Sequence, residues 1–291
     1  MKRIAALTVL SALVLSACTT GPVTPDAPSG ITAYGLVGGN QLATFGTANA
    51  AASYRAVSVT GLASGESLVD LDFRNTDNKL YAATSAGKLY VINTDTGTAT
   101  ADGASVAKTT QAIDFNPTAN RLRVVGAAND NYRLTVNSAP VPSASPAGTV
   151  TADGTFTYAA GDANFGKTPV LTAAAYTNSY NDSTSGAVPT GATTTLYTID
   201  SATDTLVENT VGPAFSTLVT RAPLGVEVGT GLAGFDIAGA SDGYLTVVTN
   251  NSTTLYRVTI PTATTTATAA TAVSTISGVS IKALALKLPN R

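Results

Sequence analysis

The sequence feature that most constrains the fold is a unit of four short strands at residues 68–100, which returns downstream in degraded copies. Within this unit, short apolar runs alternate with turn residues, and Gly87 and Gly97 stand where tight turns require a positive φ. Short strands separated by Gly, Asn and Asp are typical of all-β proteins. One four-stranded sheet cannot bury both of its faces, so the repetition predicts a ring or a stack of sheets.

Three later copies of the unit can be aligned with the first. They are residues 111–158, residues 171–178 together with 195–200, and a copy that begins at 234–237. We assign residues 195–200 to the third-strand position of their unit, because they resemble residues 88–93. The segment 179–194 before them is long and irregular, so this copy departs most from the pattern.

The two chain ends complete one more unit. Residues 280–288 alternate as a first strand with nothing after it, whereas residues 31–62 offer three strands with nothing before them. Pairing the two ends would close a ring and remove its free sheet edges. The sequence therefore predicts an all-β fold, a β-propeller of five four-stranded blades. The alternatives are a six-bladed ring, if residues 211–231 form a further blade, and a β-sandwich.

The N-terminus has the pattern of an export signal. Lys2 and Arg3 precede an apolar run that is too short for a stable transmembrane span. The ending LSAC at residues 15–18 resembles a bacterial lipobox, in which Cys18 is acylated and becomes the new N-terminus. The alternative is an ordinary export signal with a cysteine near the cut. Because Cys18 is the single cysteine, no disulfide is available to the fold.

The lipobox interpretation divides the chain into three parts. Residues 1–17 form a cleaved signal peptide, residues 18–30 a lipidated cysteine with a tether rich in Pro and Thr, and residues 31–291 one propeller domain. We expect an extracytoplasmic protein held on the bacterial membrane by its acyl chains. By resemblance to the sorting rules of double-membraned bacteria, Thr19 after the cysteine favours the outer membrane.

The composition excludes several kinds of chemistry. The chain has no His, which excludes a Ser–His–Asp triad and imidazole-ligated zinc or copper. Acylation of the one Cys would exclude thiol nucleophiles and thiolate metal sites. A net charge of −2 argues against binding nucleic acid. Carboxylate, Lys, Tyr, Arg and hydroxyl groups remain, and no spacing identifies a catalytic residue or a glycosidase pair.

Arginines gather in the second unit. Arg121 and Arg123 lie two residues apart on a predicted strand, hence on one face, and Arg133 follows in the next strand. Converging guanidinium groups could bind a carboxylate or a phosphate. The alternative is ion pairing between blades.

A second group of candidates could bind calcium. Asp162 and Asn164 alternate ahead of Gly166 and resemble a calcium loop, and Asp182 could add an oxygen. Calcium requires six to eight oxygen ligands. The alternative is therefore an Asp/Asn-rich turn. No other cofactor is indicated.

Near this segment, Tyr176, Asn178 and Tyr180 could form an aromatic–amide platform for a sugar or a peptide. We expect the binding surface at one end of the ring, near Arg121, Arg123, Asp162, Asn164 and Tyr176.

A column of carboxylates is expected at the centre of the ring. Asp72, Asp114 and Asp236 hold matching positions in three predicted first strands, which would line the central channel. The column could bind a cation or a sugar. The alternative is that each Asp accepts hydrogen bonds from backbone N–H groups of an adjacent turn, and repetition once per blade favours this alternative.

Several motifs carry a family resemblance. They are DF-x6-LYA with G-x-LY and TG (72–97), IDFNP-x3-RLRVV (113–125), YAAGDAN (158–164), AAAYTN (173–178) and TTLYTID-x2-TDTLV (194–207). In combination they resemble the bacterial domain of unknown function family 4394, a set of exported, propeller-like proteins. The resemblance covers nearly all of residues 31–289 and implies a fold, but no activity.

Fold, anchor and composition together predict a class of function. We expect a monomeric, membrane-anchored module of the cell envelope that binds or scaffolds a protein or a glycan. The alternative is a hydrolase or lyase that acts on envelope polysaccharide through carboxylate, Arg or Tyr chemistry.

Overall fold

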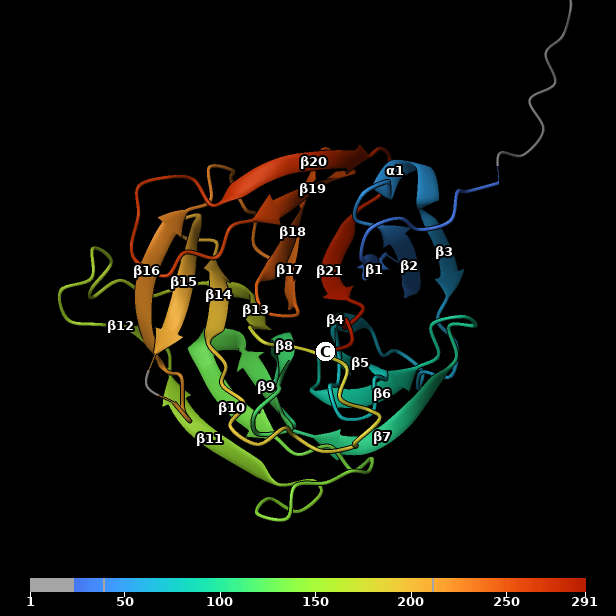
Figure 1. Cartoon of the computed structure of the whole chain (residues 1–291), viewed down its shortest axis with the longest axis horizontal. Helices are drawn as coiled ribbons and strands as arrows, with labels where there is room; N and C mark the ends of the chain where they lie inside the picture. Colours follow the sequence, from blue (N-terminus) through green and yellow to red (C-terminus); the bar gives the residue numbers. More distant parts are fainter. Residues whose placement is uncertain (1–23, 39, 211) are drawn as a thin grey trace, which may run out of the picture.

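The computed structural model describes residues 24–38, 40–210 and 212–291, so the predicted signal peptide and Cys18 lie outside the described residues. The described chain is almost wholly β-sheet, with one short helix, α1 (Ala50–Ser53), and one 3-10 turn, η1 (Ala127–Asn129). Five antiparallel sheets surround a common axis (Figure 1), which makes the protein a five-bladed β-propeller. None of the helices in these described ranges is long and apolar enough to span a membrane.

The blades are numbered from the inner strand outward. Blade 1 contains β21 (Ile281–Leu286), β1 (Thr32–Val37), β2 (Gln41–Gly46) and β3 (Arg55–Ser58). Blade 2 contains β4 (Leu68–Phe73), β5 (Leu80–Thr84), β6 (Lys88–Ile92) and β7 (Ala99–Ser105). Blade 3 contains β8 (Thr110–Asn116), β9 (Arg121–Gly126), β10 (Asp130–Leu134) and β11 (Val150–Thr155).

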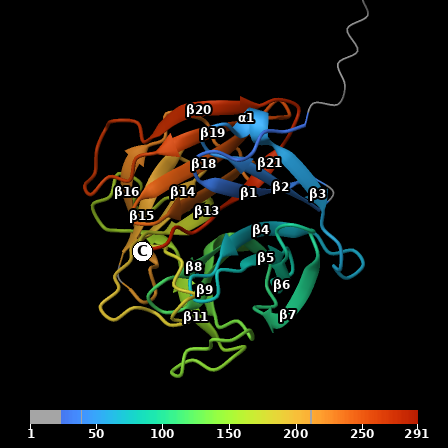
Figure 2. The ribbon, with the colours of Figure 1, turned by 45° about the vertical axis from the view of Figure 1, so that its right-hand side comes forward.

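The last two blades follow the same order. Blade 4 contains β13 (Leu171–Tyr176), β14 (Leu196–Asp200), β15 (Thr205–Thr210) and β16 (Thr217–Pro223), with β12 (Thr157–Tyr158) paired in parallel beyond β16. Blade 5 contains β17 (Ala233–Ala238), β18 (Asp242–Thr249), β19 (Ser252–Val258) and β20 (Ala270–Ile276). Figure 2 shows β20 and β7 at opposite edges of the ring.

The two chain ends close the ring, as predicted. The C-terminal strand β21 pairs antiparallel with β1, opposite Ala33 and Tyr34 among others, and becomes the inner strand of blade 1. The prediction of five blades is confirmed. The six-bladed alternative is wrong, because residues 217–223 form the outer strand of blade 4 and not a further sheet.

Two strand assignments differ from the prediction. Residues Leu196–Asp200 occupy the second position of blade 4, between β13 and β15, and not the third. Residues Thr157–Tyr158 join the sheet of blade 4 and not the second unit. Neighbouring antiparallel strands of a blade carry similar apolar patterns, so the local sequence does not distinguish the second position from the third.

The apolar core lies between neighbouring blades. One cluster joins Tyr81 and Leu89 of blade 2 to Phe115 and Leu122 of blade 3. The rings of Tyr81 and Phe115 meet edge to face, with centroids 5.0 Å apart. Similar clusters lie at the other junctions, so each blade buries its faces against its neighbours. This packing explains why one unit could not fold alone.

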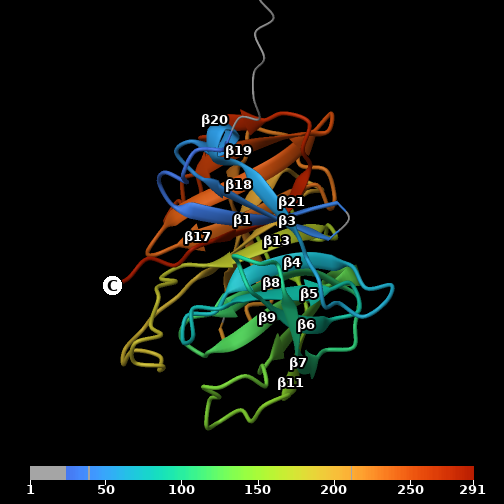
Figure 3. The ribbon, with the colours of Figure 1, turned by 90° about the vertical axis from the view of Figure 1, so that its right-hand side faces the viewer.

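The inner strands β21, β4, β8, β13 and β17 contact one another in turn around the axis. At the end where they finish, the segment 179–194 crosses the axis. The backbone N–H of Asp182 donates to Asn75 at 2.9 Å, and Arg291 Nε donates to the Asp182 carboxylate at 2.8 Å. Figure 3 shows this segment and the C-terminus on one side of the molecule, and the β1–β2 turn on the opposite side.

Candidate functional site

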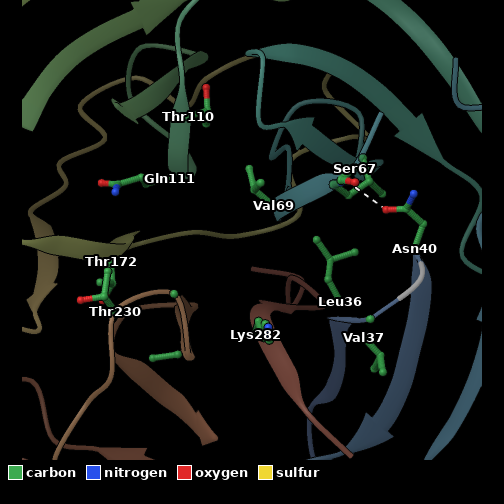
Figure 4. A pocket seen from close by; sticks show the side chains of 14 residues that line it. Leu36, Val37, Asn40, Ser67, Val69, Thr110, Gln111, Thr172, Thr230 and Lys282 are labelled. Atoms are coloured by element: carbon green, nitrogen blue, oxygen red, sulfur yellow. Dashed lines mark hydrogen bonds between the residues drawn. The ribbon is translucent and has the colours of Figure 1, made fainter. Parts of the chain in front are cut away.

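A cavity of about 400 Å³ opens at the other end of the axis, where the inner strands begin. It is lined by the first residues of inner strands, including Leu68, Thr110 and Ala233, and by the β1–β2 turn (Figure 4). The volume lies in the range of small-molecule binding sites. We refer to this region as the mouth.

Four inner strands carry a β-bulge at the mouth. In β4, β8 and β13 the pairing skips one residue, which is Val69, Gln111 and Thr172 respectively. In β21 the pairing with β1 shifts in the interval that contains Lys282. A bulge takes its extra residue out of the strand ladder and redirects its side chain. The ring thus presents one irregular residue from each of four blades.

These four bulge residues all line the cavity (Figure 4). Val69, Gln111, Thr172 and Lys282 differ in chemistry, with an aliphatic group, an amide, a hydroxyl and an ammonium. The fifth inner strand, β17, pairs without a shift and contributes the small Ala233. The mouth is therefore the level of the ring at which equivalent positions carry different side chains.

The polar groups of the mouth differ in how far they are already engaged. Asn40 is fixed, because its Oδ1 accepts from the Leu68 N–H at 3.1 Å and its Nδ2 donates to Glu66 O at 3.0 Å. The Thr172 hydroxyl is buried and has no hydrogen-bond partner among the described residues. Lys282 is exposed, and no carboxylate of the described chain lies within ion-pair distance of it. Thr172 and Lys282 are the groups that a ligand can engage.

Deeper in the channel, the predicted aspartate column forms a ring that we call the collar. It consists of Asp72, Asp114 and Asp236, which are buried, and one carboxylate oxygen from each lies within 4.8 Å of those from the other two. Each accepts a hydrogen bond from a backbone N–H of the next inner strand around the axis. The pairs are Asp72 with Phe115 at 2.7 Å, Asp114 with Tyr176 at 2.9 Å and Asp236 with Leu286 at 2.6 Å.

The alternative predicted for this column was that each Asp accepts hydrogen bonds from backbone N–H groups of an adjacent turn. The acceptance from backbone N–H groups is observed, but the turn is not the donor. Asp72 and Asp236 each also accept from the N–H of the residue that follows them. The remaining donors belong to the neighbouring blade, and not to an adjacent turn. At the equivalent positions of β13 and β21 the chain has Ala175 and Ala285, so the connection is made at three of the five junctions.

Burial raises the pKa of every carboxyl in this part of the channel. The pKa of Asp236 is raised to about 7. The pKa of Asp70, which lies two residues before Asp72 in β4, is raised to about 8. For Asp72 and Asp114, burial and then the neighbouring carboxylates hold the pKa well above its usual range. No Lys or Arg of the described residues forms an ion pair with them.

The collar has the oxygen ligands that Ca²⁺ or Mg²⁺ prefers. However, five of its six carboxylate oxygens already accept backbone N–H groups. A calcium ion needs six to eight oxygens, so few lone pairs remain for it. What the collar does in this structure is hold inner strands together.

The predicted arginine site lies inside the protein. Arg123 is 0% exposed and donates to the Asp153 carboxylate at 2.7 Å and to the Tyr176 hydroxyl at 3.1 Å. Arg133 donates to both oxygens of Asp153, at 2.7 and 2.8 Å. Arg121 donates to a threonine hydroxyl and to two backbone carbonyls. The ion pairs lie within blade 3, because Asp153 belongs to β11, and not between blades as the alternative expects. Hydrogen bonds of Arg123 to the Tyr176 hydroxyl and to Pro213 O extend the network to blade 4.

The predicted calcium ligands do not converge. Asp162 accepts from the N–H and hydroxyl of Thr220 at 2.7 and 2.9 Å, and Asn164 donates to the same hydroxyl, so both hold a turn against the outer strand β16. Asp182 lies instead in the segment across the axis, beside Arg291. The physical reason is the length of the 179–194 segment, which carries Asp182 from the blade to the centre.

The predicted aromatic platform is also divided. Tyr176 is fully buried, and its hydroxyl accepts from Arg123. Asn178 has a φ of 61° and donates to Thr193 O at 2.9 Å, which fixes the start of the 179–194 segment. Tyr180 stacks under the Arg291 guanidinium at 4.6 Å from the ring centroid.

The mouth was not predicted from the sequence. Its residues are Val69, Gln111, Thr172 and Lys282, none of which belongs to a recognisable motif. The available signal was their place, immediately ahead of the repeated first-strand motif, where the aligned units disagree. A bulge is not visible in one strand, because it is defined by the pairing with another.

The model of a family described as a domain of unknown function (DUF4394) matches residues 41–285. No curated protein matches the chain.

Solved structures with a similar fold are distant in sequence. A protein of unknown function from Bacteroides thetaiotaomicron VPI-5482 has 13% identity and a TM-score of 0.45, with 80% of this chain covered. This chain spans only 56% of the length of that protein. A chain of the nidogen/laminin complex has 7% identity and a TM-score of 0.49, with 90% of this chain and 100% of that chain covered. The Dos1 propeller has 10% identity and a TM-score of 0.37, with 80% and 59% covered.

Proposed function

The chain belongs to the DUF4394 family, and we propose that it is a binding module of the bacterial cell envelope whose ligand enters the mouth of the propeller. One observation carries this proposal. Four bulges bring four chemically different side chains to one cavity of about 400 Å³. Bulges are frequent next to functional sites, where they redirect side chains.

The absence of a partner for the Thr172 hydroxyl supports the same site. A buried polar group without a hydrogen bond lowers the stability of the fold by about 1–3 kcal/mol. The Thr172 hydroxyl does not stabilise the fold. A buried polar group of this kind is expected in a binding site, where a ligand supplies its hydrogen-bond partner. These observations favour the mouth as the binding site over the arginine and calcium candidates.

The location of the module is part of the proposal. The LSAC sequence at residues 15–18 supports lipidation of Cys18, and the Pro- and Thr-rich segment after it supports a tether. Protein with Cys18→Ser should fail to incorporate labelled palmitate and should leave the membrane fraction, whereas Thr19→Ser should behave as the wild type. Labelled Cys18→Ser protein in the membrane would contradict the anchor.

Blocking the cavity tests the binding site. Gly38 lines the mouth, and a Cβ at this position meets no atom within 4 Å, so Gly38→Phe can fill the entrance without distorting the backbone. The full chain, purified in detergent, is screened by thermal shift against peptide and glycan libraries. A compound that binds should lose at least about tenfold in affinity in Gly38→Phe, which corresponds to about 1.4 kcal/mol.

The control carries the same side chain elsewhere. Thr262 lies on the exposed β19–β20 connection, away from the mouth, so Thr262→Phe should bind as the wild type does. Equal binding by Gly38→Phe and the wild type would place the site elsewhere. Chemical conversion of a glycan by the wild type would favour the hydrolase or lyase alternative.

A further inference from the structure

The mouth has a charge pattern that limits its ligand. Among the described residues that line the cavity, Lys282 is the one with a charged side chain, and it is exposed. An ammonium without a protein carboxylate attracts a single anionic group. The collar lies farther in, where buried carboxyls disfavour a second anion. The ligand should therefore carry its one negative charge near Lys282.

The neutral groups of the mouth match an amide. Gln111 offers both a donor and an acceptor, and the Thr172 hydroxyl is unpaired. The bulges add backbone groups that the strand ladder does not use. Leu36 and Val69 supply an aliphatic surface, and the described part of the lining contains no aromatic side chain that could stack on a sugar ring.

From these observations, and resting on the proposed function, we infer that the mouth binds an N-acylated amino-acid carboxylate, the chemistry of a peptide C-terminus. The carboxylate pairs with the Lys282 ammonium at the rim. The amide next to it bonds to Gln111 and Thr172, and the aliphatic side chain lies against Leu36 and Val69. Capture of terminal carboxylates by backbone groups is an established mode of peptide recognition.

Calorimetry with two matched peptides tests the ligand class. The peptides are the acetylated tripeptide of alanine, alanine and leucine as the free acid, and the same tripeptide as its C-terminal amide. The free acid should bind at least about tenfold more tightly than the amide, because a charge-assisted hydrogen bond is roughly twice as strong as a neutral one. N-acetylleucine is the third compound, and it distinguishes a small N-acylated amino acid from the C-terminus of a peptide chain as the ligand. Binding as tight as that of the tripeptide indicates a small metabolite, and weaker binding indicates a chain end.

Variants of Lys282 test the assigned residue. Lys282→Gln should remove the difference between acid and amide, and Lys282→Arg should keep most of it. Lys287→Gln is the matched control, because Lys287 is exposed and does not line the mouth. The melting temperature of each variant shows that it is folded.

Three results would overturn the inference. Equal binding of acid and amide would remove the role of the carboxylate. Binding of a different compound from the libraries, lost in Gly38→Phe while the tripeptide does not bind, would replace the ligand class but leave the proposed function in place. Binding of nothing at the mouth would overturn both proposals.

Discussion

The mouth and the collar are built from the same inner strands, a few residues apart, and they differ in almost every physical respect. At the collar, the strands pair in regular register, and Asp72, Asp114 and Asp236 use five of six carboxylate oxygens to hold neighbouring strands. At the mouth, four pairings are interrupted, and the Thr172 hydroxyl has no partner among the described residues.

The difference between the two regions separates positions of the repeat that stabilise the fold from positions that are free to vary. The collar repeats one residue type at three of the five equivalent positions, and each of these carboxylates makes the same connection to the next blade. The mouth repeats a backbone feature but varies the side chain, as expected where a ligand is not symmetric. The repeated aspartates thus serve the fold, whereas the varied side chains on the repeated bulges are the positions at which we propose that the ligand binds.

The largest difference between the mouth and the collar is expected for the stability of single-residue deletions. Deletion of Gln111 removes the extra residue of a bulge and leaves regular pairing, so it should lower stability by only about 1–2 kcal/mol. Deletion of Ile113, two residues on, shifts Asp114 to the opposite face of β8 and should prevent folding. Circular dichroism and urea unfolding of both proteins measure the effect. Equal behaviour of the two deletions would refute the division into two levels.

Of the single substitutions, removal of one collar carboxylate should have the largest effect on stability. Asp236→Ala leaves the buried N–H groups of Ile237 and Leu286 without acceptors, for an expected loss of about 2–5 kcal/mol in the free energy of unfolding. The matched control is Asp242→Ala in the same blade. Asp242 forms an exposed pair with Arg257, whose removal should change stability by less than about 1 kcal/mol. Similar losses in urea denaturation would mean that the collar contributes no special stability.

The pH dependence of stability should report the buried carboxyls of the channel, which are the collar and Asp70. Carboxyls whose pKa rises on folding, from 3.8 to about 8 for Asp70 and about 7 for Asp236, bind protons more tightly in the folded state. Their stabilisation is complete below the unfolded pKa and is lost as pH rises toward the folded pKa. At about 1.4 kcal/mol for each pH unit below the folded pKa, the two shifts together correspond to a loss of about 6 kcal/mol in the free energy of unfolding from pH 5 to pH 8. Asp70→Asn should flatten this profile, and a wild type equally stable at both pH values would contradict the shifts.

The smallest effect separates stability from binding at the mouth. Thr172→Val removes the unpaired hydroxyl and should raise the free energy of unfolding by about 1 kcal/mol while weakening ligand binding. Thr135→Val is the control, because the Thr135 hydroxyl is also buried without a partner but does not line the cavity. It should gain similar stability and keep full binding. Thermal unfolding and calorimetry measure the two quantities, and equal binding by both variants would remove Thr172 from the site.

The candidate site was less accessible to prediction than the fold. The sequence shows that Arg123 is part of an unusual group of arginines. It does not show that the Arg123 guanidinium donates hydrogen bonds to Asp153, thirty positions away, and to Tyr176 of the next blade. Asp162 and Asp182 were grouped because they are near in sequence, whereas the chain between them crosses from the rim of blade 4 to the axis. Partners of polar groups are chosen by tertiary position, and sequence distance is a poor guide to that position.

The repeating unit, the turns and the closure of the ring could be recognised in the amino-acid sequence. Alternation of apolar residues and turn chemistry act within a few residues, so they can be identified before any contact between blades is known. The collar could be recognised as well, because aspartate returns at the same place in three strands. The bulges, the cavity that Lys282 borders and the Thr172 hydroxyl, which has no partner among the described residues, became visible only in the folded protein. Each of these depends on how one strand pairs with another or how five blades meet, and such long-range geometry leaves no local pattern in the chain.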